Sequence, residues 1–285
     1  MEILTSIAAM QSRAEAERAA GRRIALVPTM GFLHDGHLSL VREARQRADV
    51  VVVSLFVNKI QFNDSQDFAS YPRDVERDAR MLEAVGTDVL FHPEHEAMYP
   101  AQFRTRVEVD GVTEGLCGAF RPGHFRGVTT VVAKLFHATR PHVAIFGEKD
   151  YQQLVTIRTM ARDLDMGIEV VGLATVREPD GLAMSSRNVR LAPDERELAR
   201  EIPRALFAAA AAVRDGEKSA AAIVERVRRE LGRHARLRLE YVEVVDADTL
   251  ARVAILERPA RLAVALHLGA TRLIDNVALD PVVVR

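Results

Sequence analysis

The sequence predicts an α/β protein: a Rossmann-like parallel sheet with helices on both faces, followed by a smaller C-terminal α+β domain. Three observations lead to this fold class. Short apolar runs rich in β-branched residues, such as 24–27 and 50–57, are typical of buried parallel strands. Through residues 1–175 these runs alternate with amphipathic segments of helical periodicity, as a sheet covered on both faces requires. In residues 176–285 helices come before strands instead.

The first domain, residues 1–175, begins with a helix for which Thr5 is a possible N-cap and Gly21 the stop. Pro72 suits the first position of a later helix that stops at Gly86. The helices expected from this periodicity are 5–20, 36–47, 72–85, 128–138 and 151–164. The strands expected between them are 24–27, 50–57, 88–91, 105–109, 142–146 and 168–171.

The second domain, residues 176–285, is set off by a polar segment, 175–188, that contains Pro179, Gly181 and two serines. The elements expected beyond this segment are helices at 193–215 and 219–233 and strands at 240–245, 261–268 and 271–274. Helices followed by strands in a segment of this length predict a small α+β unit.

The composition predicts a soluble protein of the cytoplasm. The formal net charge is −1, which gives no general attraction to nucleic acid or to an anionic membrane, so neither partner is expected. Cys117 is the only cysteine, so nothing points to an oxidising compartment; it is either a small filler among glycines or a reactive thiol. There is no signal-peptide core, and no apolar run reaches the roughly 20 residues that a membrane span needs.

The candidate chemistry centres on residues 27–40, where a strand leads through a tight turn into a helix. Gly31 and Gly36 allow the backbone to come close to a ligand, and His34 and His37 lie near the start of the helix. The amide groups and the positive dipole end of a helix N-terminus favour an anion, so this turn is a candidate phosphate site. Two other interpretations stay open: surface histidines, or two ligands of a metal site.

Polar clusters follow three predicted strands at their carboxyl ends, at 29–37, 58–61 and 147–153. Ligands bind at that edge of an open parallel sheet, so we expect the three clusters to form one site. Lys149 is either a solvated lysine or a phosphate ligand, and 185–187 (Ser-Ser-Arg) are either loop residues or further phosphate donors. Together with the two histidines they are expected to surround a triphosphate.

Several of these residues match the motifs of a known family. His34-Asp35-Gly36-His37 resembles the His-x-Gly-His signature of the nucleotidylyltransferase superfamily, and Met184-Ser185-Ser186-Arg187 resembles its second phosphate-binding motif. Over residues 22–190 the chain is similar to the pantothenate synthetase, or pantoate-beta-alanine ligase, family. The other motifs that carry the similarity are 28–31 (Pro-Thr-Met-Gly), 56–58 (Phe-Val-Asn), 61–62 (Gln-Phe), 71–73 (Tyr-Pro-Arg), 121–125 (Arg-Pro-Gly-His-Phe), 146–153 (Phe-Gly-Glu-Lys-Asp-Tyr-Gln-Gln) and 185–188 (Ser-Ser-Arg-Asn).

The resemblance implies an enzyme that joins pantoate to beta-alanine through a pantoyl-adenylate, with ATP and Mg²⁺, and that forms a homodimer. It implies pantoate binding by Gln61 and Gln153, with Asn58 beside them and beta-alanine bordering Gln61. The residues for which it implies a part in catalysis are His37, His34, Lys149 and Arg187. The residues that it implies around ATP are Met30, Gly31, Phe32, Leu33, His34, Asp35, Gly36, His37, Gly147, Glu148, Lys149, Asp150, Val176, Met184, Ser185, Ser186 and Arg187.

Two positions add alternatives. Asp78 is a candidate near magnesium under the resemblance, or an ordinary surface charge of a helix. Lys59 stands where the family usually has a proline, and the loss of that fixed backbone angle is expected to loosen the approach to Gln61 and alter substrate affinity.

Two rival functions stay open: another nucleotidylyltransferase, and a nucleotide-binding regulator without turnover. A regulator has no need for the second, polar pocket that Gln61 and Gln153 predict.

Overall fold

The computed structural model describes residues 1–281, so the last four residues of the predicted second domain lie outside it. The chain forms two compact units. The first unit comprises 1–110, 121–148 and 156–174, and the second comprises 111–120, 149–155 and the residues from 175 onward. The units therefore interleave along the chain, and the single boundary at residue 175 stays a prediction.

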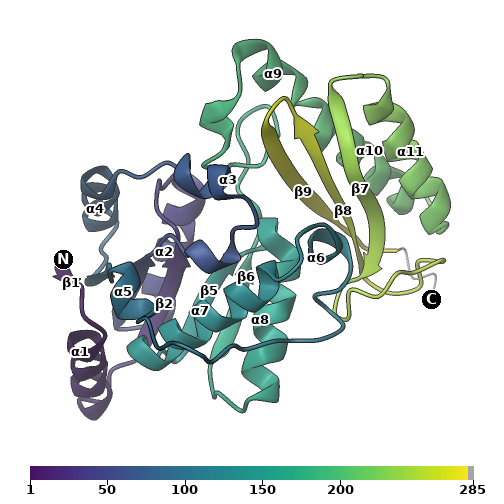
Figure 1. The fold of residues 1–285 in the computed structure, drawn as a ribbon. Coiled ribbons are helices and arrows are strands. Elements are labelled where there is room, and N and C mark those ends of the chain that lie inside the picture. Colours follow the sequence, from purple (N-terminus) through teal and green to yellow (C-terminus); the bar gives the residue numbers. More distant parts are fainter. Residues whose placement is uncertain (282–285) are drawn as a thin grey trace. The chain divides into compact units, whose positions relative to one another are not determined.

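The first unit contains a six-stranded parallel sheet with the strand order β1-β4-β3-β2-β5-β6 (Figure 1). The strands are β1 (Glu2–Leu4), β2 (Ile24–Thr29), β3 (Val50–Leu55), β4 (Val89–Phe91), β5 (Val143–Gly147) and β6 (Glu169–Leu173). From β2 the chain builds outward to β3 and β4 on one side and later to β5 and β6 on the other. The order thus reverses between β2 and β5, which is where ligands bind in open sheets of this kind.

Helices cover both faces of this sheet. On one face, Val41 of α2 and Leu82 of α4 belong to the same buried cluster as Val27 and Val53 of the sheet. Successive residues of a strand point to opposite faces, so Leu26, the neighbour of Val27, is buried on the other face. There α1 and α7 contact β2 and each other. The helices of this unit are α1 (Ile7–Ala19), α2 (Asp35–Arg47), α3 (Ser65–Ala69), α4 (Val75–Ala84), α5 (His95–Met98) and α7 (His124–Thr139). The predicted Rossmann-like fold is confirmed.

The second unit contains a three-stranded antiparallel sheet with the order β7-β8-β9. Its core joins Leu206 and Val213 of α10 and Val227 of α11 to Val244 and Val264 of the sheet. Its elements are α6 (Leu116–Phe120), α9 (Pro193–Leu198), α10 (Glu201–Arg214), α11 (Ala220–Gly232), β7 (Leu237–Asp246), β8 (Ala260–Leu268) and β9 (Thr271–Leu279), while α8 (Tyr151–Asp163) crosses from the second unit into the first. The predicted smaller α+β domain is confirmed as a fold.

Four helix predictions differ from the structure. The helix predicted at 128–138 begins earlier, at His124, and ends at Thr139. The first helix is capped by Ser6, whose hydroxyl accepts from the Ala9 amide at 3.1 Å. The helix predicted from Pro72 begins at Val75, after the cap Asp74. The segment 193–215 is two helices, because Pro203 has no N–H and is tolerated only in the first turn of a new helix, α10.

The strand predicted at 105–109 does not form. The Val107 amide donates to the Thr130 hydroxyl at 3.0 Å, and its carbonyl accepts from the Thr129 hydroxyl at 2.6 Å. Side chains of α7 therefore satisfy this extended backbone in place of a strand ladder.

Pro28, predicted to bound its strand, instead lies inside β2 opposite Ser54. The sequence-based prediction also missed β1 and α3, which have three and five residues and too little pattern to detect.

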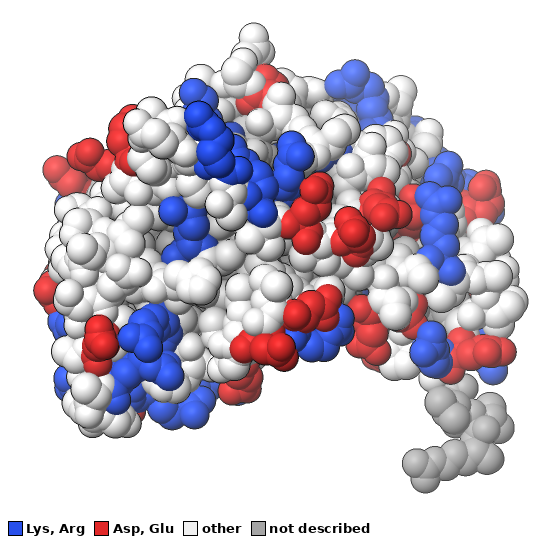
Figure 2. Space-filling model, turned by 60° about the horizontal axis from the view of Figure 1, so that its bottom comes forward, with Lys and Arg blue, Asp and Glu red and all other residues white. Residues whose placement is uncertain are grey.

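Among the helices of residues 1–281, none combines the length and the apolarity that crossing a membrane demands. Basic and acidic side chains alternate in small groups across the face of the molecule shown in Figure 2. Such a mixture matches the near-neutral formal charge of −1.

Candidate active site

The predicted phosphate turn lies between β2 and α2 and has an unusual backbone. Gly31 and Phe32 both adopt positive φ angles, 84° and 52°, in the left-handed region. Glycine adopts such an angle freely, whereas Phe32 does so at an energetic cost that surrounding contacts must offset. Thr29, at the end of β2, donates its hydroxyl to the Ser54 carbonyl of β3 at 2.8 Å and accepts from the Gly31 amide at 3.3 Å. The turn is thus tied to the neighbouring strand.

Asp78 of α4 holds this turn in place. It is 0% exposed, and its two carboxylate oxygens accept from the amides of Phe32, at 2.6 Å, and Leu33, at 2.8 Å. Arg77 donates to the Leu33 carbonyl at 3.0 Å and lies 3.4 Å from the carboxylate. Burial raises the pKa of Asp78, while the two amides and Arg77 favour its ionised form. Two consecutive backbone amides, those of Phe32 and Leu33, therefore bind the buried Asp78 carboxylate.

This arrangement changes two expectations. The alternative that Asp78 is an ordinary surface charge is wrong, because its side chain is fully buried. The amides of Phe32 and Leu33 bind a carboxylate of the protein. A phosphate at this turn therefore depends on the N-terminus of α2 and on the imidazoles rather than on these two amides.

His34 and His37 lie against each other at the start of α2. Their ring centroids are 4.1 Å apart, and the His34 amide donates to Nδ1 of His37 at 3.3 Å. An imidazole nitrogen that accepts a hydrogen bond carries no proton, so the proton of a neutral His37 ring lies on Nε2. Both side chains are half-buried. The pair can offer hydrogen-bond donors to an anion, and positive charge when protonated.

The second predicted cluster follows β3. Asn58 leads into the 3₁₀ turn η1 (Lys59–Gln61), and both Asn58 and Gln61 are buried. The Gln61 side-chain NH₂ lies 3.2 Å from the sulfur of Met30, so this cluster reaches the phosphate turn. The turn itself is closed by a hydrogen bond of 3.2 Å from the Gln61 amide to the Asn58 carbonyl, with Lys59 exposed. The effect of Lys59 on substrate affinity stays a prediction.

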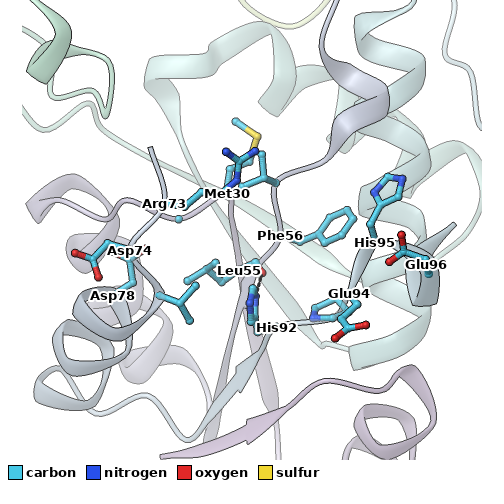
Figure 3. A pocket seen from close by; sticks show the side chains of 14 residues that line it. Met30, Leu55, Phe56, Arg73, Asp74, Asp78, His92, Glu94, His95 and Glu96 are labelled. Atoms are coloured by element: carbon cyan, nitrogen blue, oxygen red, sulfur yellow. Dashed lines mark hydrogen bonds between the residues drawn. The ribbon is translucent and has the colours of Figure 1, made fainter. Parts of the chain in front are cut away.

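A cavity of about 300 Å³ lies beside the turn, at the carboxyl ends of β2, β3 and β4 (Figure 3). Its lining is mostly apolar and includes Phe56 and Val75. His92 is held there by a hydrogen bond of 2.7 Å between Nδ1 and the Leu55 carbonyl, the dashed line in Figure 3. The predicted site residues that line this cavity are Met30, Gly31 and Asp78.

In the second unit, Lys149 and Asp150 lie in the turn η2 (Glu148–Asp150), with Lys149 Nζ 3.7 Å from an oxygen of Asp150. Gln153 is half-buried in the first turn of α8. Its neighbour Gln152 is buried and donates to the carbonyls of Val112 and Gly115 at 3.0 and 2.8 Å. Gln152 is therefore structural, which leaves Gln153 as the candidate for ligand binding.

The segment 176–187 is held by β9. Arg177 forms a bidentate ion pair with Asp275, at 2.7 and 2.9 Å, and donates to the Asn276 carbonyl at 3.2 Å. Burial raises the pKa of Asp275, and the Arg177 guanidinium opposes that shift. The Asn276 side chain also donates to the Lys149 carbonyl at 3.0 Å. Adjacent residues of β9 thus anchor both predicted phosphate-binding segments of the second unit.

The predicted phosphate-binding motif 184–187 is locally ordered. The Met184 amide donates to the Val176 carbonyl at 3.0 Å, and the Arg187 amide donates to the Ser185 hydroxyl at 3.2 Å. Ser186 is buried. The loop therefore has a defined backbone of its own within the second unit.

Each unit thus gathers part of the predicted site. In the first unit, hydrogen bonds connect the turn 30–37 with Asp78 and Gln61. Gly147 is the last residue of β5, the strand beside β2, and Glu148 follows it. In the second unit, β9 connects Lys149 with the segment 176–187. The meeting of the two groups around one nucleotide stays a prediction.

Three residues that organise Gln61 are absent from the sequence-based site. His124 Nδ1 lies 2.7 Å from the Gln61 carbonyl, to which Arg121 also donates at 3.2 Å. A Cβ on Gly127 would lie only 2.6 Å from the Ile60 carbonyl oxygen, so α7 can approach this turn only with glycine there. The Arg-Pro-Gly-His motif at 121–124 could have indicated the first two, whereas no local signal marks Gly127.

We expect Asp78→Asn to lower the free energy of unfolding by about 1–3 kcal/mol, because one buried amide then faces an NH₂ group and loses its acceptor. Urea denaturation monitored by circular dichroism measures this change. Asp74→Asn is the matched control, since Asp74 caps the same helix by accepting from the Arg77 amide at 3.0 Å and asparagine caps equally well. Equal stability of Asp78→Asn and the wild type contradicts the anchoring role.

Comparison with known proteins gives consistent matches over the whole chain. Residues 2–278 match the family described as Pantoate-beta-alanine ligase. The chain is 52% identical to the pantothenate synthetase of Syntrophotalea carbinolica over 276 residues, covering 97% of this chain and 98% of that protein. It is 53% identical to the pantothenate synthetase of Myxococcus xanthus over 280 residues, covering 97% of this chain and 96% of that protein.

Solved structures agree with these matches. A crystal structure of pantothenate synthetase from Thermus thermophilus superimposes with a TM-score of 0.94 at 44% identity, covering 99% of this chain and 100% of that one. A pantoate-beta-alanine ligase from Francisella tularensis, complexed with beta-gamma ATP and beta-alanine, gives a TM-score of 0.80 at 32% identity, covering 97% of each chain. This protein therefore belongs to the pantoate-beta-alanine ligase family.

Proposed function

We propose that this protein condenses pantoate with beta-alanine to give pantothenate, converting ATP to AMP and pyrophosphate through a pantoyl-adenylate. The observation that carries the proposal is the contact between Gln61 and Met30, 3.2 Å from nitrogen to sulfur. It joins the buried side-chain amide of Gln61, a group suited to a small hydroxy acid, to a turn suited to an anion. The Francisella tularensis relative, whose complex contains beta-gamma ATP and beta-alanine, supports two of the three substrates.

In the first step the pantoate carboxylate attacks the α-phosphorus of ATP, forming an oxygen–phosphorus bond and expelling pyrophosphate. Two anions must approach each other in this step, so cationic and donor groups that offset their repulsion lower the barrier. We assign this work to His37 and His34 of the turn and to Lys149 and Arg187 of the second unit. In the second step the beta-alanine amine attacks the activated carbonyl carbon and AMP leaves.

The remaining ATP contacts are assigned by position in the segments 30–37, 147–150 and 176–187. Those of the first unit are Met30, Gly31, Phe32, Leu33, Asp35, Gly36, Gly147 and Glu148. Those of the second unit are Asp150, Val176, Met184, Ser185 and Ser186. The positive φ of Gly31 and the N-terminus of α2 support the first group, because both bring backbone close to a bound anion.

Pantoate is assigned to Gln61 and Gln153, with Asn58 behind the first of them. Neutral amides both donate and accept, as a carboxylate with neighbouring hydroxyls requires. Beta-alanine is placed next to Gln61. The homodimer and the cytoplasmic location stay predictions.

The described residues do not fit a resident magnesium ion. Both oxygens of Asp78 accept hydrogen bonds from backbone amides, and residues 1–281 contain no group of three or more His, Cys, Asp or Glu arranged to hold a metal. Mg²⁺ is commonly held by substrate phosphates with few protein ligands. We therefore assign any Mg²⁺ to the ATP that enters with it rather than to Asp78.

Omission of each substrate in turn tests the reaction. AMP release is expected only when ATP, pantoate and beta-alanine are all present, because the adenylate needs the amine to turn over. Chromatography of the nucleotides measures it. Transfer of AMP onto a stable product without beta-alanine indicates a nucleotidylyltransferase of another kind, and absence of turnover under all conditions indicates a nucleotide-binding regulator.

His37→Ala and Lys149→Ala are each expected to slow the adenylation step at least 10-fold, roughly 1.4 kcal/mol or more in activation free energy. Pantoate-dependent exchange of labelled pyrophosphate into ATP isolates this step. His137→Ala and Lys218→Ala, which alter exposed residues of the same types, serve as controls and should exchange normally. Normal exchange by both site variants would remove the proposed roles.

Gln153→Ala is expected to weaken pantoate binding at least 10-fold and ATP binding less than 2-fold, because the lost amide faces the acid substrate alone. Isothermal titration with each ligand gives the two dissociation constants, with the exposed Gln46→Ala as control. An equal loss for both ligands contradicts the assignment.

A further inference from the structure

Three polar side chains of the first unit, the half-buried Tyr99 and the buried Asn58 and Gln61, form a relay that ends on Gln61. The Tyr99 hydroxyl donates to Asn58 Oδ1 at 2.9 Å, and Asn58 Nδ2 donates to Gln61 Oε1 at 2.9 Å. Asn58 Nδ2 also donates to the Gly127 carbonyl at 3.0 Å. Asn58 is 1% exposed, so its amide has these partners in place of solvent.

The Gly127 carbonyl fixes the direction of the relay. A backbone carbonyl can only accept, so the NH₂ of Asn58 must face it, and Oδ1 must face the Tyr99 hydroxyl. The same NH₂ then points to Gln61, whose oxygen has to turn toward it. The Gly127 carbonyl thus selects the polarity of the relay, and the hydrogen bond from the Tyr99 hydroxyl to Oδ1 holds the Asn58 amide in that orientation.

The backbone around this acceptor is closely packed. A Cβ on Gly127 would lie 2.6 Å from the Ile60 carbonyl oxygen, so α7 and the turn η1 touch directly. His124 Nδ1 lies 2.7 Å from the Gln61 carbonyl on the same turn. These contacts fix the main chain of Gln61. The relay then determines how the side-chain amide of Gln61 is oriented.

Tyr99 is a permanent donor in this chain. Its ring packs edge-on against Phe103, with centroids 5.1 Å apart, and in a tilted arrangement against His95, with centroids 5.3 Å apart. Burial raises the pKa of the Tyr99 hydroxyl above its usual range, so the proton stays on at neutral pH.

With its oxygen turned toward Asn58, Gln61 presents its NH₂ on the other side, where Met30 sulfur lies at 3.2 Å. A thioether is a weak acceptor, so this NH₂ keeps most of its capacity to bind an oxygen of a ligand. A carboxylate or a hydroxyl oxygen satisfies it, whereas a ligand group that can only donate does not.

We propose that Tyr99 is a positioning residue that acts through Asn58 to hold the Gln61 NH₂ toward the acid substrate. This inference rests on the proposed function, in which Gln61 binds pantoate. It assigns to Tyr99 a selective effect on pantoate, although the tyrosine reaches Gln61 only through Asn58.

Tyr99→Phe tests the relay because it keeps the ring and removes only the donor. We expect the KM and the dissociation constant for pantoate to rise roughly 3- to 10-fold, the effect of losing one hydrogen bond between neutral groups. The KM values for ATP and beta-alanine should change less than 2-fold. Tyr241→Phe, which removes the hydroxyl of a buried tyrosine in the other unit, should leave all three constants unchanged.

A double-mutant cycle separates positioning from packing. In the Gln61→Ala background, Tyr99→Phe should have no further effect on the pantoate dissociation constant measured by calorimetry, because the group that it orients is gone. An equal effect in both backgrounds overturns the relay, as does an unchanged pantoate constant or a parallel rise for all three substrates. If the wild type is inactive with pantoate and beta-alanine, the proposed function is overturned as well. If the wild type is fully active but Tyr99→Phe affects all three substrates equally, the relay alone is overturned.

Discussion

The hydrogen bonds from the Phe32 and Leu33 amides to buried Asp78 are the constraint on which the first unit's part of the site depends. A buried carboxylate is costly without partners, and a left-handed Phe32 is costly without support. Each offsets the other here, because the left-handed turn aims consecutive amides at one anion. The start of α2, and with it the histidine pair, is thereby set by a residue of α4.

The second unit also depends on a buried carboxylate, Asp275, which binds a guanidinium instead of backbone amides. The Arg177 guanidinium is held by Asp275 of β9, and the neighbouring Asn276 holds the Lys149 carbonyl. In both units, main-chain hydrogen bonds hold segments that carry residues assigned to phosphate. Preorganised groups of this kind stabilise a developing charge without rearranging during the reaction.

The outcome of individual predictions shows what local pattern can reveal. The β-branched run at 50–57 indicated β3, because a strand buried on both faces is apolar throughout. The helical spacing after Gly36 indicated α2, because a helix with one buried face carries apolar residues at regular intervals. The segment 105–109 has the alternation of a strand, yet threonines of α7 satisfy its backbone. Asp78 resembles any acidic residue of a surface helix until the turn that it binds is in place.

The sequence by itself determined the fold class, the family and the identity of the residues at the strand ends, because these depend on short-range periodicity and on contiguous motifs. Tertiary structure alone decided that Asp78 anchors the turn, that Gly127 must lack a side chain, and that Asn58 directs the amide of Gln61. Most of these contacts join residues tens of positions apart. Hydrogen-bond polarity and close backbone approach leave no periodic trace along the chain, so they become visible only when the elements are packed.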